Sequence, residues 1–384
     1  MKHLHAIWEL GDLPFHVGVR DSSKNTGVPD TFPFTLGVDR ELGSLVQMPH
    51  PDLGGLLDQA YVEGSQIGTP MSDSPSGRPV ADDFIAFICE ALGTEDLDGI
   101  RILEVGCGKG YLMSRLAEMG ATVLGFEPGH SSPIYAKKAG LTVLKEPFRR
   151  SAVDEQFDVI LHYGVLEHVE DPRPFLLEQA EVLSPGGRIV FAVPNCAPAI
   201  ECGDLSIIVH EHWSYFTEES LRSLATHCGF RVEQIQRGKA AGALYTSMTP
   251  GEDTAPTTDS DPVAFAEAYA DRARAGVNTM REYVANATLD GGKLGVFCAA
   301  RFINYPGLLE LDWDRIRFFD DDAALENKFY PPLPAPVLSR DTLLQDPVDH
   351  LLIMSRTFGP TLAEQLRARP ELSGCTILTI ADLF

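Results

Sequence analysis

Two histidines, a carboxylate and a tyrosine stand within nine positions of the chain, in the run Val-His-Glu-His-Trp-Ser-Tyr-Phe-Thr at residues 209–217. A histidine has a pKa of about 6.5 and therefore suits the removal of a proton at neutral pH. His210 and His212 are two positions apart, so in an extended stretch they share a face and could bind a metal ion with a carboxylate from elsewhere. The run is open to three interpretations: a catalytic loop, a metal site or a polar turn, with His210 the better candidate for a structural hydrogen bond.

The neighbouring sequence predicts that this run lies at a sheet edge where ligands bind. Thr217 is a good N-cap and Gly229 can end the helix that follows, so residues 209–216 form the approach to that helix. The run comes after a strand that ends at Val193-Pro194-Asn195. Ligands of open α/β sheets bind outside the carboxyl ends of the strands, which is where we expect this run.

A second set of residues has the pattern of a nucleotide-binding turn. The stretch 102–110, Ile-Leu-Glu-Val-Gly-Cys-Gly-Lys-Gly, places three glycines where a strand passes into a helix. Glycines permit a tight turn and close approach of the backbone to a ligand, while the helix start offers free N–H donors. Glu127 closes the next strand in Gly-Phe-Glu-Pro, and its carboxylate can accept hydrogen bonds from both hydroxyls of a ribose.

The elements that must position these residues alternate along the chain. Strand-like runs at 101–105, 122–126, 157–161 and 188–193 are separated by helix-like segments, which predicts an α/β fold with a doubly wound, mostly parallel sheet. We expect three domains: a strand- and turn-rich module at 1–78, a Rossmann-like domain at 79–248, and a second, smaller α/β domain at 249–384. Residues 249–262 have the composition of a solvated linker.

Composition narrows the classes of partner. The formal net charge of −24 disfavours nucleic acid and anionic membrane surfaces as partners, although a local cluster of donors can still hold a small anion. No apolar run reaches the roughly 20 residues that cross a bilayer, and the start lacks a signal-peptide core, so we predict a cytoplasmic protein. The seven scattered cysteines suggest neither disulfides nor a cysteine-built zinc site.

The glycine turn and two later segments resemble the class I S-adenosylmethionine-dependent methyltransferases. The later segments are His-Tyr-Gly-Val-Leu-Glu-His-Val-Glu-Asp-Pro at 162–172 and Leu-Ser-Pro-Gly-Gly at 183–187, and the resemblance covers about residues 80–245. It implies S-adenosylmethionine as cofactor, with the glycines on its methionine and ribose side, Glu127 at the ribose, and an aromatic adenine neighbourhood. The implied cofactor residues are Glu104, Gly106, Cys107, Gly108, Gly110, Glu127, Pro128, Phe148 and His162. A dinucleotide-binding Rossmann domain is the alternative.

The flanking modules resemble those of the sugar C-methyltransferases that act on nucleotide-linked keto-deoxysugars. In that family the N-terminal module is a zinc ribbon with paired cysteines, whereas Asp39 and Leu42 stand at one pair's positions here. Because a closed zinc site needs thiolates, we expect the module without its metal. The C-terminal segment Val-Phe-Cys-Ala-Ala-Arg at 296–301 lacks most glycines of the family's loop, so this domain either contacts substrate or only packs and shapes the cleft.

The narrower resemblance favours a catalytic loop over a metal site for the His-Glu-His run, and it gives roles to the residues of this run. It implies His212 as the base that makes an enolate, Glu211 as its orienting partner or a ligand for a substrate hydroxyl, and His168 on the same cleft. Val209 replaces a tyrosine of the family, and Tyr61 and Glu63 are the candidates for the position of a second one. A valine cannot hydrogen-bond an enolate oxygen, so another group does this or the substrate differs from the family's.

These observations predict a C-methyltransferase that uses S-adenosylmethionine on an enolisable carbon of a small molecule. A nucleotide-linked keto-deoxysugar is the first substrate candidate, and the chain is expected to be a monomer or homodimer. The alternatives are an O- or N-methyltransferase of a small natural-product intermediate, and a catalytically idle, cofactor-binding partner subunit.

Overall fold

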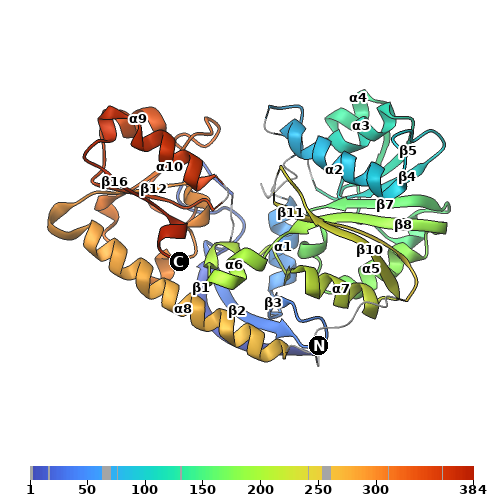
Figure 1. Ribbon diagram of the computed structural model, residues 1–384, viewed down its shortest axis with the longest axis horizontal. Helices are drawn as coiled ribbons and strands as arrows, with labels where there is room; N and C mark the ends of the chain where they lie inside the picture. Colours follow the sequence, from blue (N-terminus) through green and yellow to red (C-terminus); the bar gives the residue numbers. More distant parts are fainter. Residues whose placement is uncertain are drawn as a thin grey trace.

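The computed structural model describes residues 3–15, 18–62, 71–75, 77–129, 132–240, 242–252, 261–309, 311–356 and 358–384. Figure 1 shows two lobes joined from below by a long helix, with the N-terminal strands between them. Most of the predicted linker, and the side chain of Tyr61, lie outside the described residues.

The larger lobe is built on a seven-stranded sheet that contains the predicted parallel strands. Its order is β10-β11-β8-β7-β4-β5-β6, parallel except that β11 is antiparallel to both β8 and β10. The classic dinucleotide-binding order is 3-2-1-4-5-6, so the reversed strand β11 inside this sheet disfavours the dinucleotide alternative. The strands are β4 (Arg101–Val105), β5 (Thr122–Phe126), β6 (Thr142–Leu144), β7 (Phe157–Tyr163), β8 (Leu183–Pro194), β10 (Phe230–Arg237) and β11 (Ala243–Pro250).

Helices cover both faces of this sheet because its strands alternate apolar side chains between two cores. Ile102 and Val159 belong to the core under α2 (Gly77–Leu92), α3 (Tyr111–Glu118) and α4 (Ile134–Lys138). Leu103 and Ile160 belong to the opposite core, under α5 (Pro172–Ala180) and α7 (Glu218–His227). This two-sided burial is expected of a mostly parallel sheet, and the predicted Rossmann-like α/β fold is confirmed.

The N-terminal module forms an antiparallel sheet that the central part of the chain completes. Its order is β1 (Leu4–Pro14), β2 (Thr31–Asp39), β3 (Leu45–Gln47) and β9 (Ser214–Tyr215), followed in sequence after β3 by helix α1 (Leu53–Val62). Strand β9 belongs to the His-Glu-His run, and its Tyr215 pairs with Leu45. The run is therefore fixed as the edge strand of a sheet made mainly from the N-terminus.

The smaller lobe is the second α/β unit predicted from the sequence. Its five parallel strands have the order β14-β13-β12-β15-β16, with ranges β12 (Leu294–Phe297), β13 (Ile316–Asp320), β14 (Val337–Ser339), β15 (His350–Ile353) and β16 (Thr376–Thr379). Helices α9 (Arg340–Gln345) and α10 (Gly359–Arg367) pack on it.

Helix α8 (Pro262–Ala287) joins this unit to the N-terminal sheet, and α6 (Ala197–Cys202) lies against it (Figure 1). One hydrophobic core runs through all three parts, since it contains Phe34 of β2, Tyr269 of α8 and Phe318 of β13. None of the helices among the described residues combines the length and apolar character needed to cross a membrane. Short 3-10 helices are η1 (Arg150–Ala152), η2 (Leu166–His168), η3 (Leu205–Ile207), η4 (Leu289–Gly291), η5 (Ala299–Arg301), η6 (Pro306–Leu308), η7 (Trp313–Arg315), η8 (Pro370–Leu372) and η9 (Ile380–Asp382).

Candidate functional site

The glycine turn follows β4, and two of its glycines are required by both backbone conformation and space. Gly106 and Gly110 have φ values of 73° and 75°, in the left-handed region that favours glycine. A Cβ atom at Gly106 would lie 2.6 Å from Cγ2 of Val165, and one at Gly110 would lie 2.5 Å from Cβ of Ala136. The turn is therefore packed between the segment that leads into η2 and the start of α4.

Glu127 holds its carboxylate against this turn. Its Oε2 accepts a hydrogen bond from the backbone N–H of Gly108 at 2.7 Å, and its Oε1 accepts one from Gly129 at 2.7 Å. Pro128 follows directly at the end of β5. The carboxylate thus lies at the carboxyl ends of β4 and β5, where a residue that binds the ribose of the cofactor is expected. The ribose contact itself stays a prediction.

Glu104 and Cys107 are buried beneath the turn. Burial raises the pKa of Glu104 to about 8, although a hydrogen bond with the backbone of Met113 opposes this shift. Burial also raises the pKa of the Cys107 thiol far above its ordinary value. Both side chains are therefore uncharged at neutral pH, and they connect β4 to α3 from below the turn.

Phe148 and His162 are core residues in this structure. Phe148 packs edge-on against Phe126, with 5.4 Å between ring centroids. The ring of His162 is fully buried and stacks on Phe191 at 4.9 Å, and burial lowers its pKa to about 3. Both were predicted to lie in the adenine neighbourhood, and that role stays a prediction for each of them.

The His-Glu-His run is held rigidly by its backbone. The N–H of Trp213 donates to the carbonyl of Glu167 at 2.7 Å, and the carbonyl of Trp213 accepts from Gln47 at 3.0 Å. The hydroxyl of Tyr215 donates to the carbonyl of Val209 at 3.1 Å and accepts from its N–H at 3.3 Å. Tyr215 therefore closes the turn from Val209 as a structural residue.

The two histidines of the run face different neighbours. His210 is fully buried, its Nε2–H donates to the carbonyl of Phe32 at 3.0 Å, and its ring lies 5.2 Å from that of Phe34. His212 instead faces His168, with ring centroids 4.8 Å apart and planes at 80°. The prediction that His210 and His212 share a face is therefore wrong. His210 has the structural role that the sequence favoured for it.

His212 belongs to a compact group that we call the two-histidine cluster, namely Glu167, His168 and His212. One ligand-type atom from each of the three residues lies within 4.8 Å of the other two. Nδ1–H of His168 donates to the backbone carbonyl of Glu211 at 2.8 Å. Glu211 thus orients His168 through its main chain, and its predicted roles as the orienting partner of His212 or as a ligand for a substrate hydroxyl stay predictions.

Burial keeps the members of the cluster uncharged at neutral pH. It lowers the pKa of His168 to about 4, and it lowers the pKa of His212 well below its ordinary value with additional contributions from His168 and Arg301. Burial raises the pKa of Glu167 to about 8. Sequence reasoning missed Glu167, although its position beside His168 was a usable signal.

The cluster and the glycine turn are adjacent. Val165, whose side chain fills the space beside Gly106, starts the 3-10 turn that carries Glu167 and His168. The N–H of His168 donates to the carbonyl of Val165 at 3.0 Å. A molecule bound at the glycine turn would therefore lie within one helical turn of the two-histidine cluster.

The C-terminal domain holds the segment that enters the run. The side-chain amide of Asn304 donates to the carbonyls of Leu205, at 2.8 Å, and of Ile208. Asp204 accepts from the hydroxyl of Tyr305 at 3.2 Å and from Nε of Arg356 at 2.8 Å. Residues 204–208 are therefore anchored on the C-terminal domain.

Asp39, where the resemblance places a zinc-binding cysteine, caps its own turn. Its Oδ1 accepts from the N–H groups of Glu41 and Leu42 at 2.9 and 3.1 Å. Its Oδ2 accepts from Nη2 of Arg173 in α5 at 2.7 Å. The carboxylate thereby links the N-terminal module to the central domain.

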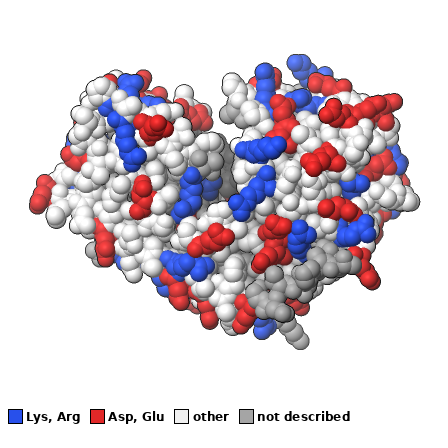
Figure 2. Space-filling view, in the orientation of Figure 1, with Lys and Arg blue, Asp and Glu red and all other residues white. Residues whose placement is uncertain are grey.

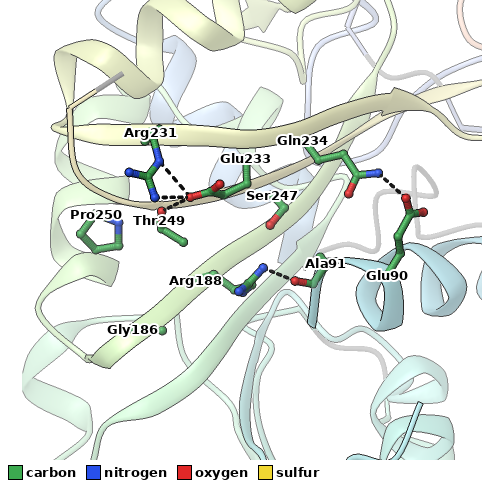
Figure 3. Close-up of a pocket in the computed structure, with 11 residues that line it drawn as sticks. Glu90, Ala91, Gly186, Arg188, Arg231, Glu233, Gln234, Ser247, Thr249 and Pro250 are labelled. Atoms are coloured by element: carbon green, nitrogen blue, oxygen red, sulfur yellow. Dashed lines mark hydrogen bonds and ion pairs between the residues drawn. The ribbon is translucent and has the colours of Figure 1, made fainter. Parts of the chain in front are cut away.

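The cavity drawn in Figure 3, of about 550 Å³, lies away from this region. It is formed by the end of α2, the start of β8 and strands β10 and β11, at the edge of the sheet opposite the glycine turn. Several of its polar groups pair with one another: Arg231 pairs with Glu233 at 2.7 Å, and Gln234 donates to Glu90 at 2.9 Å (Figure 3). It is therefore not part of the site.

Comparison with known proteins identifies the central part of the chain. Residues 79–235 match a family model described as "Methyltransferase domain". The ubiquinone biosynthesis O-methyltransferase of Cereibacter sphaeroides is 34% identical over 111 residues, which are 26% of this chain and 44% of that protein. The ubiquinone biosynthesis O-methyltransferase of Rhizobium leguminosarum bv. trifolii is 34% identical over 122 residues, which are 28% of this chain and 47% of that protein. The chain spans less than half the length of these relatives.

Two solved structures are similar to the same part. The 1,6-didemethyltoxoflavin-N1-methyltransferase of Burkholderia thailandensis, with bound S-adenosylhomocysteine, has a TM-score of 0.41 and 19% identity, and the match covers 54% of this chain and 96% of that one. The magnesium protoporphyrin IX methyltransferase of Synechocystis, with bound S-adenosylmethionine, has a TM-score of 0.39 and 14% identity. This match covers 52% of this chain and 97% of that one.

Residues 79–235 thus match a methyltransferase domain, as the sequence predicted. The relatives named above are O-methyltransferases by their names, and they match only the central part of this chain. The acceptor of this chain therefore has to be argued from its own residues.

Proposed function

We propose that this chain transfers the methyl group of S-adenosylmethionine to a small molecule bound beside the two-histidine cluster, at an atom that must first lose a proton. The observation that carries the proposal is the contact of Val165 with the glycine turn, because the same short helix bears Glu167 and His168. This contact puts the glycine turn and the two-histidine cluster at the same edge of the sheet. The cluster is the only one of its kind among the described residues.

The chemistry asks little of the protein beyond alignment and proton removal. The sulfonium of the cofactor supplies an electrophilic methyl group, so the protein has to align the acceptor atom, the methyl carbon and the sulfur. The acceptor needs a free electron pair, which it gains when a proton leaves. The uncharged imidazoles of His168 and His212 can each accept that proton, although their lowered pKa values make them weaker bases than an ordinary histidine.

The first candidate acceptor is an enolisable carbon of a nucleotide-linked keto-deoxysugar. An anionic substituent on the acceptor is supported by guanidinium nitrogens that have no hydrogen-bond partner although they are buried, Nε and Nη2 of Arg20 and Nη2 of Arg356. The exposed Arg301 acts electrostatically on His212. Figure 2 shows Lys and Arg side chains on both sides of the notch between the lobes, in a chain of net charge −24.

The second candidate is a hydroxyl oxygen. It is favoured by the relatives of the central domain, which are named as O-methyltransferases. A hydroxyl also has to lose its proton, so the same cluster serves this reaction. The two candidates differ in whether a carbon-bound hydrogen of the acceptor exchanges with solvent.

The test uses a panel of nucleotide-linked keto-deoxysugars and of phenols with S-adenosylmethionine labelled in its methyl group. We expect transfer of the label to one class and calorimetric binding of S-adenosylhomocysteine. Exchange of an acceptor C–H in heavy water, measured with S-adenosylhomocysteine in place of the donor, supports C-methylation; label transfer to oxygen without exchange supports O-methylation. Absence of binding of either cofactor form would overturn the proposal, whereas binding without transfer to any acceptor would favour the idle subunit.

A further inference from the structure

Glu167, His168 and His212 are residue types that bind metal ions, and they converge on one buried point. One oxygen or nitrogen from each lies within 4.8 Å of the others. Two imidazoles and one carboxylate are a ligand set that first-row divalent metal ions take, with positions left open for a substrate. We infer that the two-histidine cluster is a binding site for one such ion, of which Zn²⁺ is the simplest representative.

Glu167 has no counter-charge in the present arrangement. Its side chain is 3% exposed, and Oε2 has no hydrogen-bond partner. An ionised carboxylate in such a place is costly unless it is paired with a cation. A divalent cation among the three groups would supply the missing positive charge.

The histidines are already oriented as ligands. Because Nδ1–H of His168 donates to the carbonyl of Glu211, its Nε2 carries the lone pair, and this atom lies 4.0 Å from Oε1 of Glu167. Histidines that bind metals usually donate their other ring N–H to a carbonyl or carboxylate in this way. Nε2 of His212 is buried and has no hydrogen-bond partner.

Occupation requires a small contraction. Ligand atoms about 2.1 Å from a tetrahedral ion are about 3.4 Å apart. The 4.0 Å between Nε2 of His168 and Oε1 of Glu167 would therefore shorten by roughly 0.6 Å. No other pair would shorten by more than about 1.4 Å, because all three ligand atoms lie within 4.8 Å of one another, and side-chain torsions of His212 and Glu167 can supply this. The main chain of Glu167 and Glu211 keeps its hydrogen bonds during this movement.

The role of the ion rests on the proposed function, since the acceptor is the molecule that would fill one of the open positions. The acceptor's carbonyl or hydroxyl oxygen would bind the ion, and its adjacent C–H or O–H would become more acidic. That proton would pass to a hydroxide at a second open position of the then five-coordinate ion, giving water, while the electron pair stays on the acceptor. The acceptor atom then bonds to the methyl carbon as the carbon–sulfur bond breaks, leaving S-adenosylhomocysteine. His212 is a ligand in this scheme, in place of the direct base implied by the sequence.

The experiment measures metal binding to the tag-free, full-length protein after treatment with a chelator. Zn²⁺ is titrated by calorimetry, and Co²⁺ by its visible absorption, in the parent protein and in Glu167→Gln, with His227→Gln as the matched control on exposed α7. We expect one ion per chain in the parent and in the control. Glu167→Gln should lose more affinity than the roughly 10- to 100-fold that changes to outer hydrogen-bond partners cost.

Equal affinity in Glu167→Gln, or no stoichiometric binding to the parent, would overturn the inference. Melting curves and the affinity for S-adenosylhomocysteine are measured on the same samples, and both should be unchanged in Glu167→Gln. The proposed function has its own test: it fails if S-adenosylhomocysteine does not bind, and this result does not depend on whether the metal ion binds. As a second variant, His168→Asn should repeat the loss of Co²⁺ absorption.

Discussion

The glycine turn and the two-histidine cluster are neighbours, yet they are built in opposite ways. The turn comes from one continuous stretch, 104–110, and its partners Val165, Ala136 and Glu127 all belong to the central domain. The run that carries His212 is fixed by β3 of the N-terminal sheet and by residues 304–305 and 356 of the C-terminal domain. Binding of the cofactor and activation of the acceptor should therefore be separable by mutation.

His212→Asn should give the largest loss of turnover and leave the glycine turn intact. Loss of the imidazole removes either the base or a metal ligand, so we expect turnover to fall by about 10²- to 10⁴-fold. Single-turnover rates and the calorimetric affinity for S-adenosylhomocysteine are measured together, with His227→Asn as the exposed control. A parallel fall in cofactor affinity would mean that the two regions are not separable.

Gly106→Ala should act on the cofactor side alone. The left-handed backbone costs an alanine about 1–2 kcal/mol, and its Cβ would also meet Val165 at 2.6 Å. We expect at least about a tenfold loss of affinity for S-adenosylhomocysteine, since about 1.4 kcal/mol corresponds to a factor of ten. Gly93→Ala is the matched control, because Gly93 has a φ of 72° with nothing within 4 Å of the added atom. Unchanged affinity in Gly106→Ala would contradict the cofactor assignment.

Asn304→Ala should lower turnover indirectly, by loosening the segment that leads into the His-Glu-His run. It leaves the buried carbonyls of Leu205 and Ile208 without their donor, at a cost of about 1–3 kcal/mol in the free energy of unfolding. Turnover should fall while cofactor affinity stays constant, as measured by denaturant unfolding and calorimetry. The exposed Asn278→Ala on α8 controls for loss of an amide. An unaltered turnover would show that the C-terminal domain does not position the run.

Tyr215→Phe should give the smallest effect. The hydroxyl bridges the N–H and carbonyl of Val209, so its loss should lower the free energy of unfolding by about 1 kcal/mol. Turnover should change less than fivefold if Tyr215 only closes the turn. A loss as large as that of His212→Asn would instead identify Tyr215 as a substrate contact.

The local parts of this molecule could be predicted from the sequence. Strand and helix periods gave the α/β lobes, and the glycine spacing gave the turn after β4, because both depend on neighbouring residues. The pairing of β9 with β3 and the anchoring of Asp204 by Arg356 join segments far apart in the chain, so no local pattern contains them. His162 shows the same limit, since only the packing of Phe191 and Phe175 reveals that its ring is in the core.

The pairing of β9 with β3 also has a consequence during synthesis of the chain. Leu45 leaves the ribosome roughly 170 residues before its partner Tyr215, which takes about 10–30 s at common elongation rates. During this interval β3 presents an unpaired strand edge that can join other chains. The newly made protein should therefore be most sensitive to aggregation before residue 215 emerges, and slower translation of the central domain should lower its soluble yield.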